Sequence, residues 1–227
     1  MLEGNGFARY NTWAHSSALK ELYRRRCLLQ EEELVCHRQA IDILQPLLTP
    51  SCSVLDIGCG SGYFYHSFRR RNLPVSYFGL DATDSLIEVG RQCLSQYGLP
   101  PENLHCLRIE DFIAAVDHVV CINVLSNIDN FHRPLERMLG AAKSSVLLRE
   151  SIAETAFYSY REDRYLDPGD PCYVYVNTYS KTDLKEFCLE RGFSVQFIND
   201  EYTSSQPQSV IGYPHYWTFM LAKRQTA

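Results

Sequence analysis

Residues 54–64, Val-Leu-Asp-Ile-Gly-Cys-Gly-Ser-Gly-Tyr-Phe, restrict the possible folds of this chain more than any other segment. Apolar, β-favouring residues lead into three alternating glycines, and an aromatic-rich stretch that can begin a helix follows. This order predicts a strand, a tight turn and a helix N-terminus. A ligand can approach the bare backbone of such a turn and lie against helix amides, so we expect a cofactor that contains a nucleoside.

An acidic residue, Asp56, lies inside the predicted strand just before the glycines. In a dinucleotide-binding loop the glycines face a pyrophosphate, and a carboxylate beside it would repel the phosphate charge. The spacing Gly58-x-Gly60-x-Gly62 is also closer than the Gly-x-Gly-x-x-Gly of that loop. Both features favour a cationic ligand.

A second acid, Asp81, ends the next predicted strand, 23 residues after Gly58. A carboxylate at a strand tip can accept hydrogen bonds from both hydroxyls of a ribose. The alternative is a helix cap, because Asp81, Thr83 or Asp84 could each cap the helix that follows. The glycine loop upstream favours the ribose role.

Helix-like and strand-like segments alternate along most of the chain, which is typical of a parallel sheet with crossover helices. We expect an α/β fold with a seven-stranded, mostly parallel, Rossmann-like sheet whose last two strands form an antiparallel pair. Residues 1–30 are predicted to form an N-terminal helical cap, and residues 31–227 the main domain. A tyrosine-rich insertion at 152–179 follows the fifth strand. The expected strands are 54–57, 75–80, 104–109, 119–122, 145–148, 193–198 and 215–221.

The glycine loop with Asp56, and the acid at 81, resemble motif I and the following acidic position of class I S-adenosylmethionine-dependent methyltransferases. The resemblance covers residues 33–150 and implies S-adenosylmethionine as cofactor and S-adenosylhomocysteine as product. It implies the methionine end of the cofactor near Asp56 and Gly58, and the ribose on Asp81. The adenine is implied near an acid-acid-apolar triplet. The full set of cofactor-binding candidates is Asp56, Gly58, Cys59, Gly60, Gly62, Asp81, Ala82, Glu110, Asp111, Phe112 and Asn123.

Two residues are candidates for a catalytic role. Asn123 follows the fourth predicted strand, where polar side chains face the ligand crevice of such sheets, although an asparagine there can also satisfy loop backbone. His215 is surrounded by aromatic residues, so burial could keep its imidazole neutral as a base. Methyl transfer itself needs mainly alignment, which makes a base optional.

Aromatic residues near both ends of the predicted domain are candidates for the acceptor site. Tyrosines supply apolar faces and hydroxyls together, so the 152–179 insertion could form a lid over an organic substrate. The same residues could instead form a homodimer surface. The substrate-binding candidates are Tyr10, Trp13, His15, Tyr158 and Tyr216.

Bulk properties exclude several classes of protein. A net charge of −5 argues against a nucleic-acid partner, and the run Arg24 to Arg26 is expected to be a solvated helix face. Nine scattered cysteines without a Cys-x-x-Cys pair predict neither a metal site nor a disulfide framework. No apolar run is long enough to cross a membrane and no secretion signal is evident, which favours a cytoplasmic location.

The sequence therefore predicts methyl transfer from S-adenosylmethionine to an oxygen or nitrogen of a small organic molecule. Two alternatives remain open at this point. One is an NAD(P)-dependent oxidoreductase that uses the same glycine loop. The other is a non-catalytic, methyltransferase-like partner subunit, because one fold hosts many functions.

Overall fold

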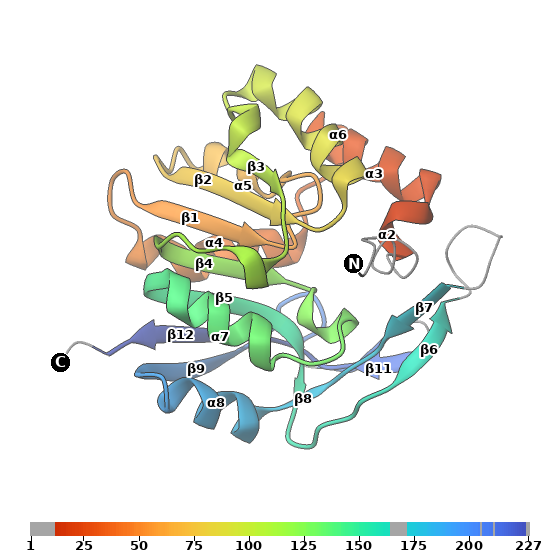
Figure 1. The fold of residues 1–227 in the computed structure, drawn as a ribbon, viewed down its shortest axis with the longest axis vertical. Helices are drawn as coiled ribbons and strands as arrows, with labels where there is room; N and C mark the ends of the chain where they lie inside the picture. Colours follow the sequence, from red (N-terminus) through yellow and green to blue (C-terminus); the bar gives the residue numbers. More distant parts are fainter. Residues whose placement is uncertain (1–11, 164–171, 205, 211, 226–227) are drawn as a thin grey trace, which may run out of the picture.

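A computed structural model describes residues 12–163, 172–204, 206–210 and 212–225 of the chain. Within these residues, seven strands form a central sheet in the order β3-β2-β1-β4-β5-β12-β9 (Figure 1). The first five strands in the chain run parallel to their neighbours, whereas β12 is antiparallel to both β5 and β9. The predicted α/β fold with a mostly parallel sheet is confirmed, including its antiparallel end.

The strands agree with the sequence prediction in number and order but differ at several ends. The third strand is only three residues long, because the chain turns into a 3₁₀ helix at Ile109–Asp111. The last strand begins at Trp217, two residues later than predicted. The bounds are β1 Ser53–Ile57, β2 Ser76–Asp81, β3 Leu104–Cys106, β4 Val116–Ile122, β5 Ala142–Ala153, β9 Phe193–Asn199 and β12 Trp217–Arg224.

Helices cover both faces of the sheet. One apolar cluster joins the sheet to α4 (Val35–Leu44), α5 (Tyr65–Arg70) and α6 (Asp84–Leu94). A second cluster joins the opposite face to α7 (His132–Ala141) and α8 (Lys181–Leu189). Strands between two helical layers are buried on both faces, which explains why β1 and β4 read as nearly continuous apolar runs.

The chain before α4 forms two helices, α2 (Thr12–His15) and α3 (Ser17–Cys27). Ser16 caps α3 by accepting a hydrogen bond from the Leu19 amide, which satisfies one of the free N–H groups of the first turn. Helix α3 lies against α6, and α2 contacts the tyrosine-rich insertion at β7. Residues 12–27 are thus helical, as the predicted cap requires, whereas its first eleven residues lie outside the described part.

The insertion contains an antiparallel hairpin of β6 (Tyr160–Asp163) and β7 (Cys172–Tyr175). The short strand β8 (Tyr179–Ser180) then returns to pair with the end of β5. A second hairpin, β10 (Gln208–Val210) with β11 (Tyr213–His215), precedes β12. In Figure 1 the β6–β7 hairpin and the N-terminal helices extend from the same side of the sheet.

No helix in the described ranges has the length and apolar character needed to cross a lipid bilayer.

Candidate active site

A cavity of about 840 Å³ lies where β1, β2 and β4 end, and α2, α3 and the β6–β7 hairpin enclose it. Ligands in open α/β sheets bind outside the carboxyl ends of the strands, as here. Seven sequence-predicted residues line this first cavity: Trp13, Asp56, Gly58, Cys59, Asp81, Ala82 and Asn123.

The glycine loop requires its glycines for a physical reason. Gly58, Gly60 and Gly62 all have φ between +58° and +75°, a backbone region that side chains disfavour. A Cβ on Gly58 would lie 2.2 Å from Val124 Cγ2, and one on Gly60 would lie 2.2 Å from Tyr23 Cε1. The loop is therefore covered closely by neighbouring side chains, and Gly60 and Gly62 do not line the cavity themselves.

Asp81 at the tip of β2 joins the strand to the glycine loop. Its Oδ2 accepts a hydrogen bond of 2.8 Å from the Gly60 amide, and its Oδ1 accepts one of 2.7 Å from the Thr83 amide. Burial raises the pKa of this carboxyl, although the two amides act in the opposite direction. The Thr83 side chain also hydrogen-bonds this carboxylate, which leaves a lone pair for a ligand. Through its bonds to Thr83, Asp81 has a local role at the start of α6 as well.

Asp56 is a buried carboxyl in the cavity wall with 5% of its surface exposed. The Tyr77 hydroxyl donates a hydrogen bond of 2.5 Å to its Oδ2. Burial is the main cause that raises the pKa of Asp56 to about 7, and the charge of Asp81 adds to it. Two carboxyl groups that form no ion pair with the described residues thus share one side of the cavity, which favours a positively charged ligand there.

Asn123 follows β4 and lines the cavity in a left-handed conformation, with φ of 60°. The next turn is held by Glu150 of β5, which is completely buried. Glu150 accepts hydrogen bonds from three successive amides, Val124, Leu125 and Ser126, and from the Ser126 hydroxyl. One side chain of the neighbouring strand therefore fixes this stretch of the cavity wall.

Several predicted residues lie elsewhere. His215 is 1% exposed, lies in β11 with its ring centre 4.9 Å from that of Trp217, and does not line the cavity. Tyr158 and Tyr216 are exposed and also do not line it. Tyr10 lies outside the described residues, and for His15 the backbone helix is described but the side chain is not.

The acid-acid-apolar triplet forms the end of the 3₁₀ turn after β3. Glu110, Asp111 and Phe112 do not line the cavity, whereas the adjacent Arg108 does. Arg108 donates a hydrogen bond of 2.9 Å to Glu110, and Phe112 packs against the apolar core. The segment thus reaches the cavity through Arg108.

Helix α3 supplies cavity residues that the sequence analysis missed. Arg24 and Arg25 form ion pairs with Glu21 and Glu31, as a solvated helix face would. Arg26 differs: it lines the cavity, donates a hydrogen bond of 3.0 Å to the Tyr63 hydroxyl, and forms no ion pair within the described residues. Its spacing of three from Tyr23, which places both on one helix face, is the signal that could have identified it.

His37 of α4 is another missed residue of the cavity wall. It is 7% exposed and stacks 4.9 Å from Tyr63 and 4.7 Å from Phe64. Burial, assisted by the charge of Arg26, lowers the pKa of His37 to about 3. This imidazole is neutral at physiological pH and forms no hydrogen bond within the described chain.

Three tyrosines of the β6–β7 hairpin, Tyr160, Tyr173 and Tyr175, line the cavity opposite the glycine loop. Their rings contact one another, with Tyr160 centred 4.6 Å from Tyr175 and 5.5 Å from Tyr173. The insertion therefore contributes one wall of the cavity. In the described residues no group of three or more His, Cys, Asp or Glu side chains could hold a metal ion.

Comparisons with known proteins agree with this arrangement. Residues 55–147 match the family model described as a methyltransferase domain. The mitochondrial ubiquinone biosynthesis O-methyltransferase of Saccharomyces cerevisiae is 29% identical over 82 residues, which are 35% of this chain. The matched region covers 26% of that relative, so the chain aligns with about a quarter of its length.

Two solved structures share the fold over nearly their whole length. The magnesium protoporphyrin IX methyltransferase of Synechocystis PCC 6803 with bound S-adenosylmethionine superposes with a TM-score of 0.61, at 16% identity, over 99% of both chains. The sugar N-methyltransferase KedS8 of Streptoalloteichus gives 0.63 at 12% identity, over 94% of this chain and 95% of the other. Residues 55–147 thus resemble a methyltransferase domain, and the sheet has the strand order of the class I S-adenosylmethionine-dependent methyltransferase fold.

Proposed function

We propose that this protein binds S-adenosylmethionine in the first cavity and transfers its methyl group to an oxygen or nitrogen of a small organic molecule. The observation that carries the proposal is a pair of carboxyls, Asp56 and Asp81, which lie on either side of a glycine loop at adjacent strand ends and form no ion pair with a described residue. A ligand with a ribose and a cationic amino acid end fits this pair better than a diphosphate does.

Each part of the cofactor has a counterpart in the cavity wall. Asp81 would accept hydrogen bonds from the ribose, and Asp56 would face the cationic methionine end. The unpaired guanidinium of Arg26 would bind the methionine carboxylate, because it lines the same cavity without a carboxylate partner in the described chain. The nucleobase would lie toward Ala82 and the turn at 108–112.

When bound, the cofactor would supply a methyl group on a positively charged sulfur. The acceptor atom forms a bond to the methyl carbon, and the sulfur on the opposite side leaves as a neutral thioether. The work of the protein is to align the acceptor and exclude water. The tyrosines of the β6–β7 hairpin and Trp13 of α2 would cover the acceptor with aromatic surface. His37, rather than His215, is the imidazole placed to accept a hydrogen bond from an acceptor hydroxyl or amine.

The size and lining of the cavity support a small organic acceptor. About 840 Å³ lies within the range of pockets for a cofactor and a drug-sized ligand, roughly 300–1,000 Å³. The wall combines aromatic rings with polar and charged side chains. The yeast relative is named as an O-methyltransferase and KedS8 as an N-methyltransferase, so either acceptor atom is compatible with the family.

Calorimetry with S-adenosylhomocysteine and with NADH tests the cofactor. We expect micromolar binding of S-adenosylhomocysteine and none of NADH, and binding of NADH alone would overturn the proposal in favour of an oxidoreductase. Transfer of radiolabelled methyl groups to a panel of phenols, carboxylic acids and amines then tests the reaction. Tight cofactor binding without transfer to any acceptor, together with a stable hetero-complex, would indicate a non-catalytic partner subunit.

A further inference from the structure

Asn123 lies at the boundary of two cavities. It lines the first cavity with Asp56, and it also lines a second cavity of about 530 Å³ together with Arg149, Gln208 and Trp217. The opposite part of its wall comes from Arg26 and residues 31–36, which include Glu31, Glu32 and Glu33. A ligand in either cavity meets the side chain of Asn123.

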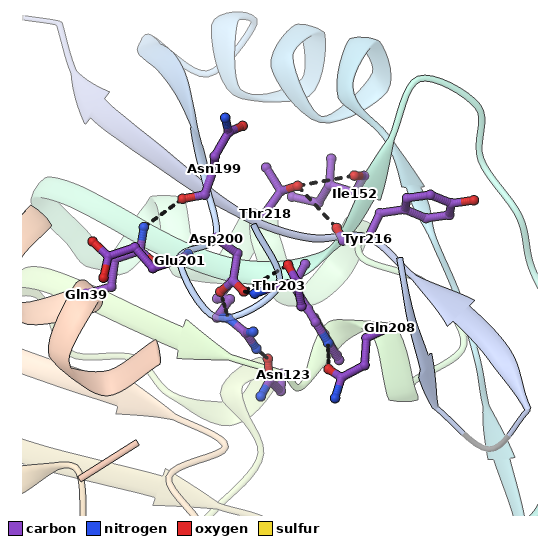
Figure 2. A network of polar contacts seen from close by, with 12 residues as sticks. Gln39, Asn123, Ile152, Asn199, Asp200, Glu201, Thr203, Gln208, Tyr216 and Thr218 are labelled. Carbon is purple, nitrogen blue, oxygen red and sulfur yellow. Dashed lines mark hydrogen bonds and ion pairs between the residues drawn. The ribbon is translucent and has the colours of Figure 1, made fainter. Parts of the chain in front are cut away.

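Arg149 of β5 forms two hydrogen bonds with Asn123. Its Nη1 donates a hydrogen bond of 2.5 Å to Asn123 Oδ1, and its carbonyl accepts one of 2.8 Å from the Asn123 amide. The guanidinium is 4% exposed, lies 4.6 Å from the centre of the Trp217 ring, and donates through Nε to Asp200 Oδ1 at 2.6 Å. Asp200 is itself fixed by the amide and hydroxyl of Thr203 (Figure 2).

This contact determines which end of the Asn123 amide faces a ligand. A guanidinium has hydrogen-bond donors only, so the oxygen of Asn123 must be the end that faces Arg149. The NH₂ group is then the free end of the amide, because it forms no hydrogen bond within the described chain. Asn123 therefore offers a ligand two donors and no acceptor.

The buried ion pair behind Asn123 is poorly explained by stability alone. A buried Arg–Asp pair is often no more stabilising than apolar residues of the same volume. The left-handed backbone of Asn123 adds a cost of roughly 1–2 kcal/mol, although asparagine tolerates it better than most residues. A strained residue with an oriented amide at a cavity wall is typical of a functional position.

We infer that Arg149 is a positioning residue that turns the Asn123 NH₂ group toward the acceptor, so that the site selects small molecules with a carbonyl or carboxylate oxygen at this point of the wall. The inference rests on the proposed function and deepens it. An acceptor that places only an apolar group against Asn123 shields these N–H donors from water and leaves them unpaired. A site whose donors are met by a carbonyl or carboxylate oxygen therefore discriminates against molecules that lack this oxygen.

Two probes that differ in one oxygen test this selection. Para-hydroxyacetophenone carries a carbonyl where para-ethylphenol carries a methylene, and both have the same phenol. Binding of each is measured by calorimetry on protein saturated with S-adenosylhomocysteine. We expect the wild-type protein to bind the carbonyl probe about tenfold more tightly. Wild-type protein that does not distinguish the probes, whether it binds both or neither, overturns the inference.

Asn123→Asp reverses the polarity of the group with little change in shape. Its carboxylate can still pair with Arg149, but its second oxygen only accepts hydrogen bonds. We expect the tenfold preference to disappear. Asn72→Asp is the matched control, because Asn72 also has a left-handed backbone, with φ of 51°, and is exposed away from both cavities. A preference that survives in Asn123→Asp as it does in Asn72→Asp contradicts the inference.

The role of Arg149 is tested without removing Asn123. The double variant Arg149→Met/Asp200→Leu replaces the buried ion pair by apolar groups and frees the Asn123 amide. Discrimination between the probes should fall to within about twofold, whereas Arg149→Lys, which can still donate to Oδ1, should retain part of it. Full discrimination in the double variant would overturn the positioning role. If the double variant does not fold, Arg149→Lys decides the question, because discrimination equal to that of the wild type would overturn the role in the same way. Failure of the wild-type protein to bind S-adenosylhomocysteine would instead refute the proposed function.

Discussion

The two sides of the first cavity are built in different ways. The cofactor side comes from one continuous stretch, residues 53–83, in which a strand, a glycine loop, a helix and a second strand follow one another. The acceptor side is assembled from α2, the end of β4 and the β6–β7 hairpin, which are far apart in the sequence, and α3 borders both sides through Tyr23 and Arg26. Local backbone geometry thus defines the first side, and long-range contacts define the second.

The two loops that border the cavity show the same contrast. The glycine loop keeps its shape through three glycines with positive φ and a bond to the nearby Asp81. The loop after β4 keeps its shape through Glu150, a buried carboxylate from another strand, which gathers three of its amides. A change in the first loop should affect the cofactor, and a change on the second side should affect the acceptor.

Gly60→Val should produce the largest effect. The left-handed backbone and the collision with Tyr23, 2.2 Å from the new Cβ, together cost at least about 3 kcal/mol. We expect the affinity for S-adenosylhomocysteine to fall more than a hundredfold, measured by calorimetry, as α3 is pushed from the loop. Gly140→Ala is the control, because a Cβ there meets nothing within 4 Å, and it should leave binding unchanged. Wild-type affinity in Gly60→Val would break the assignment of this loop.

Asp81→Asn should have the next largest effect. In the wild-type protein the N–H groups of Gly60 and Thr83 each donate to one oxygen of Asp81. The asparagine has one oxygen only, so its NH₂ group must face one of these two N–H groups, and that hydrogen bond is lost. The lost bonds to these amides and to the ribose amount to about 2 kcal/mol, so we expect affinity for S-adenosylhomocysteine to drop about thirtyfold. If the affinity stays within threefold while the melting temperature falls, Asp81 serves only to cap α6.

That the residues of the cofactor side bind the cofactor stays a prediction, but their arrangement could be derived from the sequence because its signals are local. The order of Asp56, the glycines and Asp81 determines a strand, a turn and a strand tip within thirty residues, and the structure places all three parts together. The parallel sheet and its antiparallel end also followed from alternation and from strand patterns. The position of Asn123 at the cavity wall could be predicted for a similar reason, because Asn123 directly follows a buried strand.

The acceptor side could not be predicted in the same way. The contact between Tyr23 and Gly60, and the bond from Arg149 to Asn123 across 26 residues, depend on how distant segments pack. Arg26 was read as solvated because its neighbours Arg24 and Arg25 are. His215 was expected at the cavity because of its aromatic neighbours, yet it lies in β11 and is buried against Trp217 instead.

The pH dependence of binding sharpens the role of Asp56. With a pKa of about 7, its carboxyl is mostly neutral at pH 6 and mostly ionised at pH 8. A cationic ligand end needs the ionised form, so affinity for S-adenosylmethionine should rise about tenfold over this interval. Asp56→Asn should remove this dependence. Calorimetry at three pH values measures it, and a wild-type slope that persists in Asp56→Asn would exclude this carboxyl as its source.

The stability of the ligand-free protein should change in the opposite direction. The folded state holds the Asp56 proton more tightly than the unfolded state, because burial raises the pKa from its ordinary value of 3.8. The protonated Asp56 carboxyl therefore contributes to the free energy of unfolding. Its contribution is complete below about pH 4 and is lost as the pH rises through 7. Asp56→Asn should therefore gain relative stability at pH 8 in urea titrations, and equal differences from wild type at pH 5 and pH 8 would contradict the raised pKa.

Tyr175→Ala should produce the smallest effect and the most selective one. Tyr175 lines the cavity from the β6–β7 hairpin and contacts Tyr160, so its removal takes aromatic surface from the acceptor side only. We expect the KM of the acceptor found in the transfer assay to rise about fivefold, equivalent to about 1 kcal/mol, with no change in S-adenosylhomocysteine affinity. Tyr158→Ala, 51% exposed and outside the cavity, is the matched control. If both variants raise the KM equally, the effect comes from a change in the structure of the insertion and not from lost contact between Tyr175 and the acceptor. If Tyr175→Ala weakens binding of S-adenosylhomocysteine instead, the division of the cavity into two sides is wrong, because a residue assigned to the acceptor side would then belong to the cofactor side.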